Sequence, residues 1–203
     1  MLDVKSITSL EIENVCVHIL DITAITDDDF LSELPQELIV QARQSFKSLK
    51  RQREWLGVRL LLKQLVGDIV RIGYESSGAP FLINSDQHIS ISHSGALVAI
   101  VLSNDRVGVD VQIISDKPLR LKSHFLSDDE EHLLANELDV LTAVKLWCAK
   151  EAVYKYLSIP ETPLIGGIHL QQKDGKVIEV NHGLTLSFRH YGDAVFAVAT
   201  KIN

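Results

Sequence analysis

The chain has 203 residues, of which 46% are hydrophobic and 23% are charged, and its formal net charge is −7. This length is enough to bury a hydrophobic core, and the composition excludes the disordered, collagen-like and low-complexity classes of protein. The negative net charge argues against a nucleic-acid-binding protein. Cys16 and Cys148 lie far apart and outside any CxxC or Cys/His pattern, so the sequence predicts neither a zinc site nor a disulfide framework.

The sequence also lacks the usual signals for export or for membrane insertion. No apolar run approaches the length of a membrane-spanning helix, and the residues after Met1 do not follow the charged-then-apolar pattern of a signal peptide. We therefore expect a soluble protein of the cytoplasm with no membrane partner.

Hydrophobic periodicity predicts a mixture of helices and strands. In chain order these are a strand near 15–20, one or two helices over about 30–66, a hairpin within 88–102, a strand over 107–113, a helical region over 127–157 and further strands within 168–202. Turn-forming residues separate them, among them Gly67 and Gly73 after the first helical region and Pro160 and Pro163 after the second. Asp174-Gly175 predicts a hairpin turn between two of the last strands.

Two parts of the chain resemble each other. The segments 89–100 and 184–198 share a hairpin pattern, and each follows a predicted helix. The helices share a spacing that places three side chains along one stripe, Trp55, Arg59 and Lys63 in the first and Trp147, Glu151 and Lys155 in the second. This repeat predicts an α+β fold of two similar halves, 1–105 and 106–203. A chance similarity between amphipathic elements is the alternative.

One segment of this acidic chain is strongly basic. Between residues 43 and 63 the basic residues are Arg43, Lys47, Lys50, Arg51, Arg53, Arg59 and Lys63, and Glu54 is the single acid. Such a segment can hold an anion, but its helical spacing is equally that of a solvated helix face.

The first motif with chemical content is Gly108-Val109-Asp110-Val111-Gln112. In a strand, alternate side chains point to opposite faces, so Val109 and Val111 face a core while Asp110 and Gln112 share the other face. There their oxygens can bind a hard cation. The simpler alternative is a polar strand face.

Two further motifs each have a simple structural explanation when taken alone. In Ile91-Ser92-His93-Ser94-Gly95, a histidine ends a strand and enters a glycine turn, where it is usually a turn residue without a catalytic role. In the segment 147–155, Glu151 and Lys155 are i,i+4 neighbours on a helix and can form a surface ion pair.

Together the three motifs form an ordered pattern: strand-His-turn, Gly-x-Asp-x-Gln, then Trp-x-x-Lys-Glu-x-x-x-Lys. This order resembles the 4′-phosphopantetheinyl transferase superfamily, and within it the long monomeric branch typified by the surfactin synthetase activator. The segment 125–130, Phe-Leu-Ser-Asp-Asp-Glu, is similar to the Phe-x-Ser-x-x-Glu element of that family and also reads as a capping box. The resemblance covers about Arg53 to Lys155.

The resemblance implies a pseudo-twofold arrangement of the two halves, with the active site in the cleft between them. It implies an enzyme, of the holo-[acyl-carrier-protein] synthase type, that transfers the phosphopantetheine arm of coenzyme A to a serine of an apo carrier protein and releases 3′,5′-ADP. The carrier is an acyl, polyketide or peptidyl carrier protein, and the enzyme is expected to be a Mg²⁺-dependent monomer, with Mn²⁺ as an alternative metal.

Residue roles follow from the same resemblance. Asp110, Gln112 and Glu151 are the implied metal ligands. The implied coenzyme A-binding residues are His93 at the pyrophosphate, Lys155 on the reacting phosphates, Arg53 on the 3′-phosphate, and Ser92. Glu151, Lys155 and His93 form the expected catalytic set. Glu151 is also the expected acceptor of the serine proton.

Two positions depart from the family pattern. Gln112 stands where many members have a glutamate, and Ala79 stands where a Gly-Lys-Pro element has lysine. We expect weaker binding of magnesium from the first and of coenzyme A from the second. They also motivate the alternative of a catalytically silent relative, while a pure interaction domain would require the ordered motifs to be a coincidence.

Overall fold

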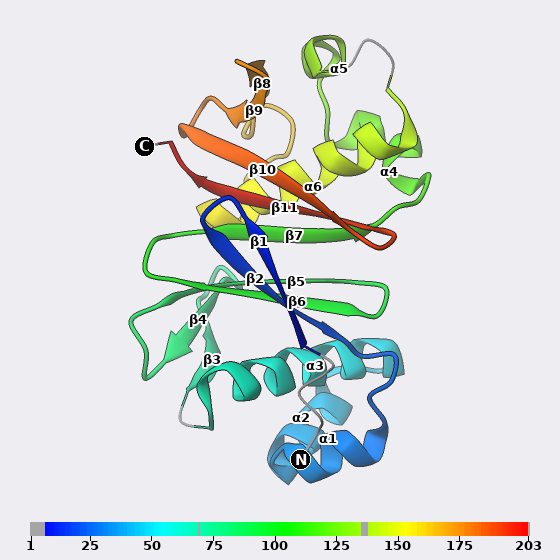
Figure 1. Ribbon diagram of the computed structural model, residues 1–203, viewed down its shortest axis with the longest axis vertical. Helices are drawn as coiled ribbons and strands as arrows, with labels where there is room; N and C mark the ends of the chain where they lie inside the picture. The colour runs from blue at the N-terminus through cyan, green and yellow to red at the C-terminus, as the bar shows by residue number, and fades with distance from the viewer. Residues whose placement is uncertain (1–6, 69, 135–137, 203) are drawn as a thin grey trace.

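The structure of the protein is a computed structural model that describes residues 7–68, 70–134 and 138–202 (Figure 1). Its helices are α1 (Asp27–Glu33), α2 (Gln36–Ser45), α3 (Leu49–Val66), α4 (Lys117–Arg120), the 3₁₀ helix η2 (Lys122–His124), α5 (Asp128–Leu134) and α6 (Val140–Leu157). None of the described helices is both long and apolar enough to cross a membrane.

The strands form two main antiparallel sheets and one small hairpin. The first sheet has the order β1-β2-β6-β5, from β1 (Ile7–Ile12), β2 (Val15–Asp21), β5 (His88–Ser94) and β6 (Leu97–Ser103). The second has the order β7-β11-β10-β9-β8, from β7 (Gly108–Ile113), β8 (Leu170–Lys173), β9 (Lys176–Glu179), β10 (Leu184–Tyr191) and β11 (Ala194–Lys201). The separate hairpin joins β3 (Arg71–Tyr74) to β4 (Pro80–Ile83). The α+β fold class is therefore as predicted.

The two main sheets meet along their edge strands β5 and β7. Three serine hydroxyls of β5 accept backbone N–H groups of β7: Ser90 from Val109 at 2.9 Å, Ser92 from Val111 at 3.2 Å and Ser94 from Ile113 at 3.0 Å. Because serines spaced by two residues share one face of β5, they bind alternate N–H groups of its neighbour. We call this contact the serine seam; it joins the sheets in a fixed register.

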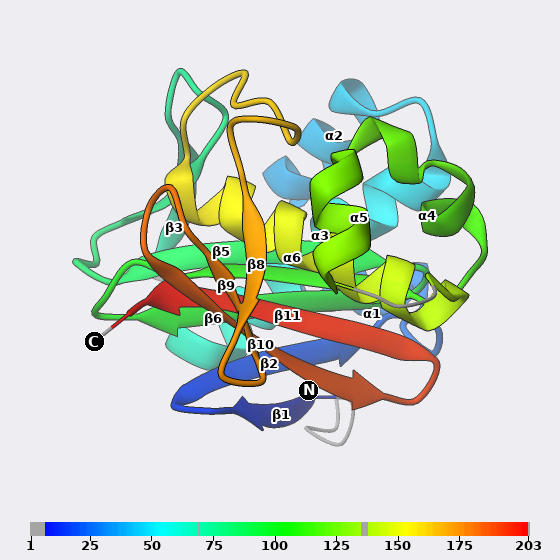
Figure 2. The same cartoon turned by 90° about the horizontal axis from the view of Figure 1, so that it is seen from above.

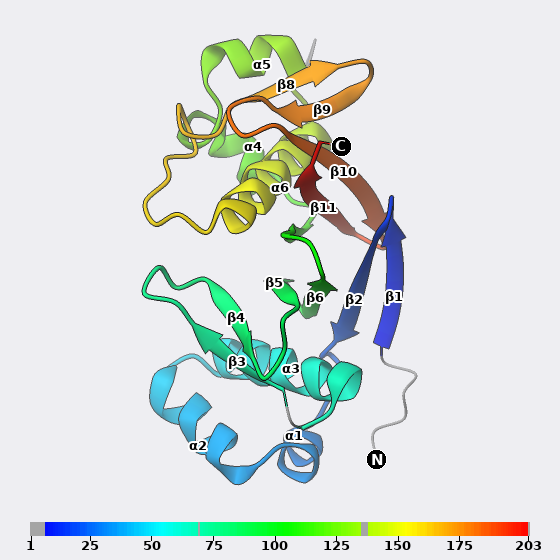
Figure 3. The ribbon, with the colours of Figure 1, turned by 90° about the vertical axis from the view of Figure 1, so that its left-hand side faces the viewer.

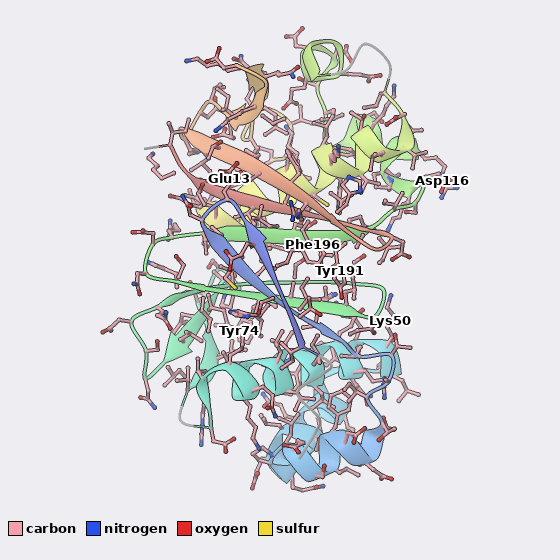
Figure 4. All side chains as sticks on the ribbon, in the orientation of Figure 1. Glu13, Lys50, Tyr74, Asp116, Tyr191 and Phe196 are labelled. Carbon is pink, nitrogen blue, oxygen red and sulfur yellow. The ribbon has the colours of Figure 1, made fainter. Side chains whose placement is uncertain are left out.

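Apolar packing supports the same junction. One core cluster combines Val17 and Ile19 of β2 with Val109 and Val111 of β7 and Phe196 of β11, and all five are at most 1% exposed. Phe196 and its edge-on neighbour Tyr191 lie near the middle of the molecule (Figure 4). As predicted, the valines of β7 face a core.

Each sheet carries one long helix. The core cluster that involves α3 contains residues of the first sheet, and the cluster that involves α6 contains residues of the second. Figure 2, seen from above, places α3 and α6 on the side opposite to the β1–β2 hairpin. In Figure 3 the tip of the β3–β4 hairpin and the loop after α6 approach each other on that helical side.

The predicted boundaries of the helices and turns agree in part with those of the structure. The helical region expected over 30–66 is three helices, since Pro35 precedes α2 and the Ser48 hydroxyl caps α3 by accepting the Arg51 N–H. The region over 127–157 is two helices, α5 and α6. The Ser127–Glu130 capping box and the turn at Asp174-Gly175 are confirmed. The strands β1, β3 and β4 and the helix α4 were not expected. The last three have only four residues each, which is too few for a clear hydrophobic period.

Candidate active site

A cavity of about 680 Å³ opens on the helical side of the molecule and is lined by α3, β5, β7 and α6, together with residues 77–80. This size is within the range of small-molecule and cofactor sites. Six of the seven candidate residues line it: Ser92, His93, Asp110, Gln112, Glu151 and Lys155. The seventh, Arg53, is not among the lining residues.

The centre of the site is a hydrogen-bonded cluster of Asp110, Ser92 and Lys155. Lys155 Nζ donates to Asp110 Oδ1 at 2.7 Å and to Ser92 Oγ at 2.8 Å. The Ser92 hydroxyl donates to the same Asp110 oxygen at 2.7 Å. Lys155 is therefore not simply the surface partner of Glu151, since its ammonium group bridges from α6 to β5 and β7.

The backbone explains why these side chains meet. A Cβ atom at Gly108 would lie 1.9 Å from the carbonyl oxygen of Ala152, so only glycine lets β7 approach α6 this closely. Two residues later, Asp110 then faces the helix. On α6, Trp147, Glu151 and Lys155 follow each other at single-turn spacing, and all three line the cavity.

One carboxylate oxygen of Asp110 has no hydrogen-bond partner in the part of the chain that the structure describes. This oxygen, Oδ2, is buried and accepts no hydrogen bond from a nitrogen or oxygen of the described residues, although a buried carboxylate oxygen normally has a partner. Burial, together with the nearby Asp110, raises the pKa of the buried Cys148 thiol. Glu151 lines the same cavity, and its pKa is raised by burial and by the negative charge of Asp110, an effect that Lys155 opposes. A cation bound by Asp110 and Glu151 would give Asp110 Oδ2 a partner and would offset the repulsion between the two carboxylates.

These acids fit a divalent metal with few protein ligands. The described residues contain no group of three or more His, Cys, Asp and Glu side chains arranged to hold a metal ion. Mg²⁺, however, commonly takes one or two carboxylates and completes its shell with water and substrate phosphates. Gln112 also lines the cavity and offers an amide oxygen, while its Nε2 donates to the Ile113 carbonyl at 3.1 Å.

His93 lies beside a pair of opposite charges. Its Nε2 is 2.8 Å from Arg51 Nη1, and its Nδ1 is 3.5 Å from Glu54 Oε2. Burial lowers the pKa of His93; Glu54 and Asp110 oppose the shift, whereas Arg51 and Lys155 add to it. Glu54 and Arg51 line the cavity, and neither was singled out from the sequence as a site residue.

A second arginine lies further along the cavity wall. The Arg59 guanidinium is 3.2 Å from the centre of the Trp55 ring and donates to the Tyr74 hydroxyl at 3.3 Å. Burial lowers the pKa of Arg59, an effect opposed by Tyr74, but an arginine keeps its charge in proteins. Arg51, Trp55 and Arg59 succeed one another at helical spacing, so the cavity is lined by one face of the basic segment.

Arg53 lies on another face of α3. It donates to Asp27 Oδ1 at 2.8 Å and to the carbonyls of Ile22 and Ile25, and its guanidinium lies 5.5 Å from the Phe30 ring centre. Two residues along a helix correspond to a rotation of about 200°, so Arg53 cannot face the same way as Arg51 and Trp55. In this structure Arg53 ties α3 to the segment that precedes α1.

Lys150, which precedes Glu151, turns away from the cavity. Its ammonium group is fully buried, lies 2.5 Å from Glu130 Oε1 and donates to the carbonyls of Leu164 and Ile168. Glu130 also accepts the backbone N–H groups of Leu170 and Ser127. The lysine of the third motif and the glutamate of the Phe-x-Ser-x-x-Glu element therefore form one buried ion pair. It holds α5 and the loop after α6 against α6.

Comparisons with known proteins agree with this arrangement of motifs. Residues 106–199 match the family model described as 4′-phosphopantetheinyl transferase superfamily. The 4′-phosphopantetheinyl transferase gsp of Aneurinibacillus migulanus is 31% identical over 113 residues, which make up 51% of this chain and 47% of the relative. The chain thus spans about half the length of this curated relative.

Proposed function

The chain belongs to the 4′-phosphopantetheinyl transferase superfamily, and we propose that it transfers the phosphopantetheine arm of coenzyme A to a serine of an apo carrier protein. The second product is 3′,5′-ADP. The proposal extends to a holo-[acyl-carrier-protein] synthase type of enzyme of the long monomeric branch, acting in the cytoplasm.

One observation carries this proposal. Asp110, whose Oδ2 has no hydrogen-bond partner among the described residues, lies in the same cavity as Glu151 and is hydrogen-bonded to Lys155. Phosphoryl transfer requires acidic residues that bind a metal ion and a cation that stabilises the negative charge on the phosphates. The arginines Arg51 and Arg59 on the α3 wall supply further positive charge for an anionic nucleotide.

In the proposed reaction the carrier serine oxygen attacks the β-phosphorus of coenzyme A, the one that bears the pantetheine arm. The bond from that phosphorus to the bridging oxygen breaks, and 3′,5′-ADP leaves with the bridging oxygen and its negative charge. Glu151 accepts the serine proton, directly or through water, and its raised pKa suits it to this task.

The other residues bind and orient the substrate. Lys155 offers its ammonium group to the charge that develops on the phosphates, and Ser92 holds that group in place through its hydrogen bond. We assign Arg51 to the pyrophosphate, with His93 acting on it through its contact with Arg51, and the Arg59–Trp55 stack to the nucleotide end. Arg53 is not carried into this assignment, because its contacts lie outside the cavity.

Asp110 and Glu151, with the amide oxygen of Gln112, would hold the metal. Bound Mg²⁺, or Mn²⁺ in its place, would neutralise negative charge on the phosphates. A neutral amide in place of a third carboxylate leaves the metal less tightly held, so we expect a higher requirement for free magnesium.

The test is a transfer assay with coenzyme A, magnesium and a panel of apo acyl, polyketide and peptidyl carrier proteins, followed by intact-mass spectrometry. We expect a mass increase of one phosphopantetheine group on at least one carrier. The matched control is a carrier whose acceptor serine is replaced by alanine.

Calorimetry with coenzyme A separates the alternatives. Binding without transfer to any carrier would identify a catalytically silent relative, for which Gln112 and Ala79 provide the motive. An absence of binding would leave an interaction domain and would contradict the proposed function.

A further inference from the structure

Glu54 is a buried acid that the mechanism above does not use. It belongs to α3, and its side chain is only 5% exposed. A carboxylate that is removed from water in this way loses hydration, and it stays ionised only where cations or hydrogen-bond donors replace that hydration. The groups around Glu54 therefore indicate its purpose.

Three groups surround this carboxylate. Arg51 Nη1 donates to Oε2 at 3.1 Å, and His93 Nδ1 lies 3.5 Å from the same oxygen. Lys50 Nζ lies 3.7 Å from Oε1, but its side chain is 68% exposed and it lies at the end of α3 (Figure 4). The two groups that share Oε2 both line the cavity.

The contact between Arg51 and His93 determines the tautomer of the histidine. A guanidinium has donors only, so His93 Nε2, which lies 2.8 Å from Arg51 Nη1, must accept and carries no proton. A neutral imidazole then carries its proton on Nδ1, which faces Glu54. Glu54 thus favours the tautomer that lets His93 accept from Arg51.

The same contacts orient the guanidinium. Among the described residues, Arg51 uses Nη1 for both Glu54 and His93. The other N–H groups of its planar fork are left for a ligand, and two of them match the spacing of phosphate oxygens. An arginine held at one nitrogen by two partners loses less conformational freedom when it binds an anion.

We propose that Glu54 is a positioning residue, whose carboxylate holds His93 in the Nδ1–H tautomer and, with His93, fixes Arg51 to receive a phosphate group of coenzyme A. This inference rests on the proposed function for the identity of the anion. It assigns direct contact with the phosphate to Arg51 and places His93 behind it.

The first measurement needs no ligand. Long-range ¹H–¹⁵N spectra of the labelled protein, with His93 assigned by comparison with His93→Gln, report which ring nitrogen carries the proton. We expect the Nδ1–H tautomer in the parent and a shift toward Nε2–H in Glu54→Ala. A parent in the Nε2–H form, or an unchanged tautomer in Glu54→Ala, would overturn the proposal.

The second measurement is coenzyme A binding by calorimetry. Glu54→Ala should weaken binding about tenfold or more, as expected when a hydrogen bond to a charged group is lost. Glu54→Gln keeps one acceptor oxygen and should recover part of that affinity. Lys50→Gln, which removes only the exposed neighbour of Oε1, should bind like the parent.

The outcomes are distinguishable. A purely structural role for Glu54 predicts a lower melting temperature with parental tautomer and affinity, and that result would reject the proposal. If the parent itself does not bind coenzyme A, the proposed function fails, but the tautomer comparison still decides whether Glu54 positions His93. Should Glu54→Ala not fold, Glu54→Gln takes its place: its neutral amide should weaken coenzyme A binding relative to the parent and leave more of His93 as Nε2–H, and parental values for both would reject the proposal.

Discussion

Lys155 on α6 and Asp110 on β7 form an ion pair with a nitrogen–oxygen distance of 2.7 Å, although they lie 45 residues apart in the chain. The pair uses only one Asp110 oxygen and leaves the other, Oδ2, buried and without a partner among the described residues. An aspartate whose sole task was to bind a lysine would not need to leave a buried oxygen unpaired, since this costs free energy. This arrangement supports the proposal that Asp110 is a metal ligand whose side chain Lys155 holds in place.

Asp110→Ala should abolish transfer while the fold remains intact. Even partners that only orient a metal ligand are worth about 10–100-fold in activity, so loss of the ligand itself should cost more than about 100-fold. The fold should persist because Lys155, 26% exposed, can reach water. Asp116→Ala, which removes an exposed acid beyond the end of β7, is the control for the assay and for circular dichroism. Undiminished turnover in Asp110→Ala would remove Asp110 from the site.

Local periodicity predicted much of the site. The alternation in β7 places Asp110 and Gln112 on one face and two valines in a core, and the structure has both. The four-residue spacing of Trp147, Glu151 and Lys155 places them on one helical stripe, and all three line the cavity. Such patterns depend only on neighbours in the chain, which is why they can be read without a structure.

Contacts between distant segments could not be read in this way. The serine seam joins β5 to β7 across the two sheets, and serines at alternate positions carry no signal for it. Within the basic segment the resemblance selected Arg53, whereas in the structure Arg51 lines the cavity and Arg53 does not. The helical period separates their faces, but only the packing of α3 shows which face lines the cavity.

The arginines of α3 can be compared in one series. Arg59→Ala should weaken coenzyme A about tenfold and more than it weakens 3′-dephospho-coenzyme A, because Arg59 is assigned to the nucleotide end. Arg53→Ala should chiefly lower the melting temperature, since Arg53 binds the carbonyls of Ile22 and Ile25. Calorimetry with coenzyme A and with 3′-dephospho-coenzyme A measures the loss of affinity in each variant. A selective loss of coenzyme A binding in Arg53→Ala would instead support the prediction made from the sequence, in which Arg53 binds the 3′-phosphate.

Ala79→Lys should strengthen coenzyme A binding. Ala79 lines the cavity beside Pro80, so a lysine there adds a cation where an anionic ligand is expected. A single exposed charge contributes about 0.2–1 kcal/mol, which corresponds to a gain in affinity of at most a few-fold. Because salt screens such a contribution, the gain should shrink between low and high ionic strength. Ala79→Gln has a similar length without the charge and should not bind more tightly than the parent.

The buried ion pair of Lys150 and Glu130 should dominate the stability of the second half. Lys150→Met leaves an uncompensated buried carboxylate and should lower the free energy of unfolding by about 3–5 kcal/mol. Adding Glu130→Gln removes that charge and keeps an acceptor for the Leu170 N–H, so the double variant should recover part of the loss. Urea denaturation provides the measurement.

An exposed pair provides the control for this series. Arg120 lies 3.4 Å from Asp116, and both side chains are more than 60% exposed, so Arg120→Met should lower the free energy of unfolding by less than about 1 kcal/mol.

The pKa of Glu130 is lowered although burial alone would raise it, because the Leu170 N–H and Lys150 stabilise the ionised form. Its contribution to stability is therefore present above the ordinary glutamate pKa and is lost as the pH falls through the lower, folded-state value. Equal losses of unfolding free energy in Lys150→Met and Arg120→Met would contradict the larger stabilising role given to the buried pair.

By sequence alone Glu151 and Lys155 could form an i,i+4 surface pair, but Lys155 Nζ instead donates to Asp110 and Ser92, so we expect both residues to act in catalysis. A surface pair predicts small and similar stability losses on mutation. In the catalytic interpretation, Glu151→Gln removes both a metal ligand charge and the proton acceptor. Turnover should then collapse, and extra magnesium should restore little of it.

Lys155→Ala should chiefly lower kcat rather than raise KM, by about 100-fold or more, because its cation is needed most where charge develops in the transition state. Its removal also takes one of the two donors, the other being Ser92, away from Asp110 Oδ1, so magnesium affinity should not fall with turnover. Steady-state kinetics over a magnesium titration, with a carrier that the parent modifies, separates these effects. Lys145→Ala, on the same helix but outside the cavity lining, is the control. If Glu151→Gln and Lys155→Ala both transfer the arm at near-parental rates, the proposed mechanism is wrong at its centre, whatever the family.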